Sequence, residues 1–284
     1  MTLLQEHSKS LSHGLSKSVS KVAENVSEKG VHRLRTTIRR VETLVNYAEP
    51  RLTKKQEKIL DELRALRKRA GKVRDLDIQI GLLASIGNRS ASADKRALLE
   101  SLKKKRTKQA GRLISAVKKL DDSKFSSRLA RITEKSSSED SQQEGTSAQL
   151  QEIKDELARL STDYSSQEVL KPKRLHELRI ELKLLRYRAE LAPETAEQKD
   201  LAEKLKAVQD SIGAWHDWQM LAESAENQFG DRINCALLVE IRSLFAAKYS
   251  AANSAAINLL TSYSAVPKKK PHSVQSTHAL AQRA

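Results

Sequence analysis

The chain has 284 residues, enough for one large or two ordinary domains, and its 52 Lys and Arg against 36 Asp and Glu give a net charge of +16. Such an excess favours anionic partners. Its single cysteine, Cys235, excludes an intrachain disulfide framework, and no apolar run approaches the roughly 20 residues of a membrane span. We therefore expect a cytoplasmic protein with no membrane partner, in which Cys235 is a small buried side chain.

The pattern of apolar residues predicts an all-α protein. Only 9 Gly and 5 Pro occur, and long stretches consist of the helix formers Leu, Ala, Lys, Arg, Glu and Gln, with a helical period of about 3.6 residues. No stretch shows the alternation of apolar and polar residues that is typical of a strand. The N-terminal segment is Ser-rich and basic, as organelle transit peptides can be. It nevertheless carries one apolar stripe, which predicts a first core helix. The stripe consists of Leu4, Leu11, Leu15, Val19, Val22 and Val26.

The next element occurs twice, about 144 residues apart. Residues 31–35 (VHRLR) pair with residues 175–179 (LHELR), and Arg39 then falls opposite Lys183. The apolar positions match at the same offset: Val31, Leu34, Ile38, Val41 and Val45 pair with Leu175, Leu178, Leu182, Leu185 and Ala189. A fixed spacing of this kind indicates an internal repeat, so we expect one helical unit used twice.

A second pair of segments supports this duplication. Residues 71–75 (GKVRD) correspond to residues 213–217 (GAWHD), at an offset of 142. Helices with short connections favour antiparallel bundles, and two copies predict a pseudo-twofold. A polar stretch, SSSEDSQQEGTS, separates the copies. The predicted organisation is a first half at 1–135, a linker at 136–147, a second half at 148–266 and a basic, disordered tail at 267–284.

Each copy also carries a basic stripe. At about 100° per residue, His32, Arg35 and Arg39 share one side of a helix, as do their counterparts His176, Arg179 and Lys183. The stripe borders the apolar stripe, so these groups are partly desolvated and an anion would compensate them. Alternatively, they extend past the core and pair with acids such as Glu42, Glu181 or Glu190.

Further polar and aromatic residues have more than one interpretation. Lys105, Lys108 and Arg112 share a third basic face, which could equally be a solvated surface. Asp75 and Asp217 could be ligands or general bases, but a carboxylate that orients Arg or His is the favoured reading. Trp215 and Trp218 could stack on bases, and core packing is favoured instead.

Four segments of the chain, taken in order, resemble the signature of the CHAD family, the conserved histidine α-helical domain. They are VHRLRTTIRR, GKVRDLD, LHELRIELKLLRY and AVQDSIGAWHD. The resemblance implies two four-helix bundles about a pseudo-twofold, with a shared basic cavity that binds inorganic polyphosphate. By position, the implied lining is His32, Arg35, Arg39, Arg40, His176, Arg179, Lys183, Arg186 and His216. Glu42 departs from the pattern, which often has another Arg there.

The candidate polyphosphate-binding residues also include Arg74, Lys105, Lys108 and Arg112. The expected function is a non-catalytic polyphosphate-binding module for scaffolding or targeting, located in the cytoplasm at polyphosphate bodies, with polyphosphate-associated proteins as further partners. We expect no cofactor and no metal. Many relatives carry a CYTH domain marked by E-x-E-x-K, and none occurs in this sequence. A stand-alone module is therefore expected.

Two alternative functions remain open at this stage. The same charge would support nucleic-acid binding through phosphate contacts, although 4% aromatic residues offer few stacking surfaces and no nucleic-acid motif is present. A histidine protein that handles phosphate or metal is the other alternative. His32, His176 and His216 lie far apart in sequence, with no H-x-x-x-H pair and no Walker loop.

Overall fold

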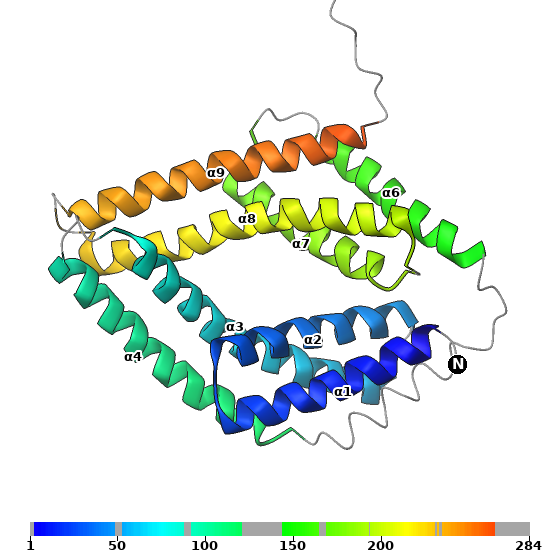
Figure 1. The fold of residues 1–284 in the computed structure, drawn as a ribbon, viewed down its shortest axis with the longest axis horizontal. Coiled ribbons are helices and arrows are strands. Elements are labelled where there is room, and N and C mark those ends of the chain that lie inside the picture. Colours follow the sequence, from blue (N-terminus) through cyan, green and yellow to red (C-terminus); the bar gives the residue numbers. More distant parts are fainter. Residues whose placement is uncertain are drawn as a thin grey trace, which may run out of the picture.

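The computed structural model describes residues 3–48, 53–87, 92–120, 144–164, 169–192, 194–230, 232 and 235–264. Every regular element in these ranges is an α-helix (Figure 1), which confirms the predicted class. The helices are α1 (Leu3–Glu24), α2 (Glu28–Ala48), α3 (Lys54–Ser85), α4 (Ser92–Val117), α6 (Glu144–Tyr164), α7 (Pro172–Ala189), α8 (Ala196–Phe229) and α9 (Ala236–Ser262). None of these helices is long and apolar enough to cross a membrane.

Two sequence predictions fall largely outside this description. The basic tail at 267–284 lies beyond the described residues, as do residues 136–143 of the predicted linker. Residues 144–147, the end of that linker, form the start of α6. The domain boundaries therefore stay predictions.

Local sequence signals explain where the longest helices begin. Thr53 caps α3: its hydroxyl accepts a hydrogen bond from the backbone N–H of Gln56, and the Gln56 side chain accepts one from the backbone N–H of Thr53. Thr195 caps α8 by accepting from the backbone N–H of Gln198 at 3.0 Å. Pro172 opens α7, where the absence of an N–H costs nothing. These signals fix the start of three helices that line the site described below.

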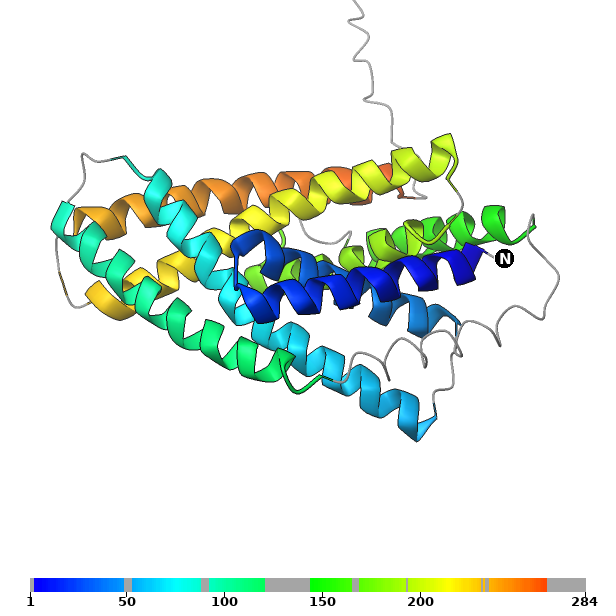
Figure 2. The same ribbon diagram turned by 60° about the horizontal axis from the view of Figure 1, so that its bottom comes forward.

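The helices form two halves with matching neighbours. In the first half α1 packs on α2 and α4, and α3 packs on both α2 and α4. In the second half α6 packs on α7 and α9 in the same way, and α8 packs on both α7 and α9. The halves meet where α3 packs on α8 and α2 packs on α7, as Figures 1 and 2 show from two directions. A duplication would produce this arrangement.

Three apolar cores hold the molecule together. One belongs to the first half and includes Leu34 and Leu63, and one belongs to the second half and includes Leu178 and Trp215. The third is built jointly by the outer ends of the long helices. Its members include Leu83 of α3, Ile86 just after α3, Leu98 and Leu102 of α4, Trp218, Leu221 and Phe229 of α8, and Leu237 and Ile241 of α9. The two halves therefore share a core as well as a contact surface.

The burial pattern confirms several sequence predictions. All ten apolar positions matched at the offset of 144 are buried, and so are Trp215, Trp218 and Cys235. Of the N-terminal stripe, Leu15, Val19 and Val22 are buried on α1, which confirms a first core helix. The apolar stripes thus place the basic stripes of α2 and α7 at the edge of the two cores.

Candidate polyanion-binding cavity

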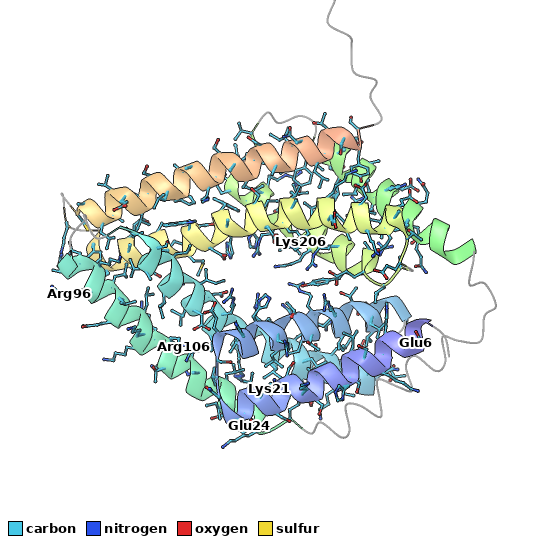
Figure 3. All side chains as sticks on the ribbon, in the orientation of Figure 1. Glu6, Lys21, Glu24, Arg96, Arg106 and Lys206 are labelled. Atoms are coloured by element: carbon cyan, nitrogen blue, oxygen red, sulfur yellow. The ribbon has the colours of Figure 1, made fainter. Side chains whose placement is uncertain are left out.

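A cavity of about 730 Å³ lies between the two halves, and α2, α3, α7 and α8 all contribute to it. Its lining holds nine Arg and Lys residues against three Asp, an excess of six positive charges. The cations are Arg35, Arg39, Arg40, Arg67, Arg74, Arg179, Lys183, Arg186 and Lys206. Lys206, labelled in Figure 3, lies on α8 and lines the cavity from the second half. Such a concentration of one charge sign attracts a polyanion.

Both basic stripes reach this cavity. His32, Arg35 and Arg39 line it from α2, and Arg179 and Lys183 line it from α7. Two segments about 144 residues apart in sequence therefore face one another across a shared space. The close approach of α2 and α7 produces this arrangement.

Several of these cations are held in a partly buried, mutually repelling group. Burial is the largest cause that lowers the pKa of Arg39, of Arg179 and of Lys183. For Lys183 the neighbouring Arg179, Arg39 and Arg35 add to the effect and bring its pKa to about 7. None of Arg35, Arg39, Arg179 and Lys183 forms an ion pair with a carboxylate of the described part of the chain. Asp75 and Asp217 act on these cations electrostatically without forming an ion pair, so the charge of the group is only partly compensated.

Other cations of the lining, which do not belong to the two basic stripes, are paired. The Arg40 Nε and the Glu190 Oε2 atoms lie 3.0 Å apart, and Glu190 also accepts from Arg186. Arg74 pairs with Glu28. Because Arg40 comes from α2 and Glu190 follows α7, this carboxylate ties the two halves together at the edge of the cavity. These ion pairs thus involve Arg40, Arg74 and Arg186 and none of the four unpaired stripe cations.

Arg67 and Glu42 make a further pair that the sequence did not suggest. The Arg67 Nε donates to the Glu42 Oε1 at 2.9 Å, and the Glu42 side chain is only 10% exposed. In the second half, Arg186 occupies the position 144 residues after Glu42, and Gln209 lies 142 residues after Arg67. The Arg186 Nε donates to the Gln209 Oε1, also at 2.9 Å. The first half therefore has its cation on α3, as Arg67, whereas the second half has it on α7, as Arg186, at the position that corresponds to Glu42 of α2.

Two Asp residues, one from each half, sit among the cations. Burial raises the pKa of Asp75 and of Asp217, and Arg35 and Arg179 oppose that rise at Asp75. Arg179 does the same at Asp217, while Asp75 raises the Asp217 pKa further. This placement, with each carboxylate beside guanidinium groups, is the one expected for an orienting role.

The histidines differ from one another in their surroundings. His32 and His216 line the cavity, whereas His176 is exposed and does not, although its ring centroid lies 5.4 Å from that of His216. Burial lowers the pKa of His216 to about 4, helped by Arg179 and His176. Burial also lowers the pKa of His32, helped by Arg74. His216 is therefore neutral at pH 7, and the surroundings of His32 favour its neutral form.

Some predicted residues lie elsewhere, and some cavity residues were missed. Lys105, Lys108 and Arg112 are on α4 and do not line the cavity. Residues missed from the sequence include Thr36, Arg67, Ile78, Tyr187, Lys206, Gln209 and Asp210. Arg67 and Gln209 could have been found, because the offset of 142 that pairs Asp75 with Asp217 also pairs these two residues.

The fold and the site together define an all-helical protein with a cavity that holds an excess of Arg and Lys over Asp. The comparisons narrow this class. The family model for the CHAD domain matches residues 10–226, and the chain belongs to this family. The comparison with curated proteins finds no match.

Two solved structures share the fold. The crystal structure of the CHAD domain from the plant Ricinus communis is 18% identical, with a TM-score of 0.69 and 91% of each chain covered. PptA from Streptomyces chartreusis is 17% identical, with a TM-score of 0.62, and the match covers 92% of this chain and 98% of PptA. At this level of identity the two matches establish the fold alone.

Proposed function

We propose that this chain is a non-catalytic module that binds inorganic polyphosphate in the cavity between its two halves. The observation that carries the proposal is the group formed by Arg35, Arg39, Arg179 and Lys183. These four cations are supplied equally by α2 and α7, and none of them forms an ion pair with a carboxylate of the described residues. A phosphate chain presents regularly spaced charges and no bases. Arg forks and a Lys point charge are therefore sufficient to hold it.

The cavity chemistry favours binding over catalysis in this proposal. A neutral His216 is a conceivable nucleophile. The surrounding cations, however, serve retention of the polymer equally well, so we assign no reaction to the site. The binding role extends to scaffolding or targeting, in which the protein is held at polyphosphate bodies or holds polyphosphate near partner proteins. Release of orthophosphate from polyphosphate by the pure protein would overturn the non-catalytic assignment.

The direct test is a binding titration of the whole chain with polyphosphates of graded length, at several salt concentrations. By analogy with nucleic acids, a site that contacts roughly 6 to 10 phosphates loses about 10³ to 10⁵ in affinity between ~50 and ~200 mM salt. We expect a loss of this order for long chains. Binding that barely responds to salt would contradict the cavity as the site.

A variant separates the cavity from general surface charge. Replacing Arg35, Arg39, Arg179 and Lys183 with Ala should abolish tight binding and leave helical content intact. A matched control replaces four exposed lysines outside the cavity: Lys29, Lys173, Lys199 and Lys248. If both variants lose affinity equally, net charge explains the binding. Competition with duplex DNA at one salt concentration tests the nucleic-acid alternative, which predicts that DNA displaces polyphosphate.

A further inference from the structure

A second basic groove lies on the outside of the first half, between α3 and α4. It measures about 400 Å³ and is lined by Arg69, Lys72, Gln109, Arg112, Ser115, Ala116 and Lys119. It shares no lining residue with the cavity. At ~100° per residue, Arg69 and Lys72 lie roughly 140° to 160° around α3 from Arg67 and Arg74, which face the cavity. The groove is therefore a separate site on the opposite side of that helix.

The groove contains four cations and no carboxylate. Residues 64–74 carry six Arg and Lys residues and residues 101–120 carry eight, and neither stretch contains Asp or Glu. No carboxylate of the described part of the chain forms an ion pair with a cation of the groove. Elsewhere on the surface such cations are paired along their own helix: Arg159 with Glu156 and Asp163, and Lys204 with Asp200. The groove cations repel one another, and a bound anion would relieve that repulsion.

The internal repeat does not account for this groove. At the offset of 142, Arg69 and Lys72 correspond to the uncharged Ser211 and Ala214. The basic stripes of the cavity recur in both halves, whereas this surface belongs to the first half alone. On α4, Lys105 and Lys108 lie within roughly 60° of Arg112 and are exposed, so they extend the same face.

We propose that this outer groove is a second polyanion site, which binds a further segment of inorganic polyphosphate; the identity of the ligand rests on the proposed function. No aromatic ring lines the groove, so it offers nothing for a base to stack on. It offers four flexible cations and the Gln109 amide, which suit phosphate oxygens. The exposed positions of all four cations make this a weaker and more salt-sensitive site than the enclosed cavity.

Site counting on the full chain tests this proposal, with tripolyphosphate as the probe in calorimetry at ~50 mM salt. The groove variant is Lys72→Gln with Arg112→Gln. A control, Lys173→Gln with Lys248→Gln, removes the same charge from exposed positions of the second half. The cavity variant is Arg39→Ala with Arg179→Ala. Gln is a good helix former, so the groove variant should remain folded, which circular dichroism confirms.

We expect two sites in the wild type and the control, only the tighter one in the groove variant, and only the weaker one in the cavity variant. For long polyphosphate, the groove variant should lower the slope of log affinity against log salt by roughly 1.4, at about 0.7 per lost phosphate contact. A groove variant that matches the control overturns the second site and leaves the proposed function standing. A wild type that binds no polyphosphate overturns the proposed function itself. A groove variant that keeps both tripolyphosphate sites but loses duplex DNA binding shows a nucleic-acid surface instead.

Discussion

The Arg67 guanidinium donates to the Glu42 carboxylate across the α2–α3 contact, with 2.9 Å between Nε and Oε1. Glu42 stands where the sequence resemblance led us to expect another Arg. The positive charge is not lost, because Arg67 supplies it from α3 and lines the cavity. In the second half the corresponding cation is Arg186 on α7, which lines the cavity and donates to the neutral Gln209 on α8.

The first prediction concerns this exchange of positions. Arg67→Gln should weaken polyphosphate binding and lower the melting temperature, because it leaves a nearly buried Glu42 carboxylate unpaired. Glu42→Arg should also lower the melting temperature, since it places a cation beside Arg67 and Arg39. The double variant Glu42→Arg/Arg67→Gln copies the second half and should recover most of both losses. Additive losses in the double variant would show that the two positions are not equivalent.

The second prediction concerns pH. Lys183 faces Arg179 and Arg186 on α7, Arg35 and Arg39 on α2, and the carboxylates of Asp75 and Asp217, and its pKa is about 7. A bound polyanion favours its protonated form, so binding above pH 7 requires proton uptake. Affinity should fall by up to tenfold per unit between about pH 7 and 8.5. Lys183→Arg stays charged throughout and should flatten the profile. A wild-type profile as flat as that of Lys183→Arg would contradict the prediction.

The same lysine should limit stability in the absence of ligand. Its pKa is lowered from 10.5 in the folded state, so between about pH 7 and 10.5 the unfolded chain binds more protons, and stability rises with pH through this window. Lys183→Met removes the charge and keeps a similar shape. We expect a higher melting temperature at pH 7, by roughly 2 to 4 °C for each kcal/mol gained. The difference in melting temperature between Lys183→Met and the wild type should shrink toward pH 10. Equal melting temperatures of the two proteins at pH 7 would contradict this prediction.

The fourth prediction concerns Gly71. A Cβ at this position would meet the Arg35 Nη1 closer than real Cβ atoms come, so Arg35 lies directly against the α3 backbone. Gly71→Ala should push the guanidinium aside and weaken polyphosphate binding, because Arg35 loses its place in the cavity. Gly81→Ala is the control, since a Cβ there meets open space on the same helix. It should stabilise the protein by about 0.5 to 1 kcal/mol and leave affinity unchanged. Equal affinity in both variants would show that the position of Arg35 is unimportant.

The helical class, the repeated helix and the basic stripes could be read from the sequence, because each rests on a regular spacing along one element. Lys206 and Tyr187 could not be selected in this way. They reach the cavity only because α3 packs on α8 and α2 packs on α7, which are contacts between segments far apart in the chain. The three basic residues on α4 show the converse. Helical spacing places these three residues on one face of α4, but whether that face lines the cavity depends on how α4 packs.

The third core leads to the last prediction, which concerns the two halves as separate pieces. Residues 1–135 alone would expose Leu83, Leu98 and Leu102, which in the whole chain pack with Trp218 and Leu221. Neither 1–135 nor 148–284 should be a well-packed monomer, and each should bind a hydrophobic dye or aggregate. Co-expression should restore a stable complex that binds polyphosphate. In the intact chain, Leu221→Ala should cost about 2 to 5 kcal/mol and lower one shared melting transition rather than one of two.

For this reason, the contribution of each half to binding is best measured in the whole chain. One variant replaces His32, Arg35 and Arg39 with Ala, and the other replaces His176, Arg179 and Lys183. Two linked half-sites can gain about 10² to 10⁴ in affinity over a single one, provided that the polymer reaches both. Each variant should therefore lose most of its preference for long over short polyphosphate. A monomeric, cooperatively melting 1–135 that binds long polyphosphate as tightly as the whole chain would overturn both the shared core and the shared cavity.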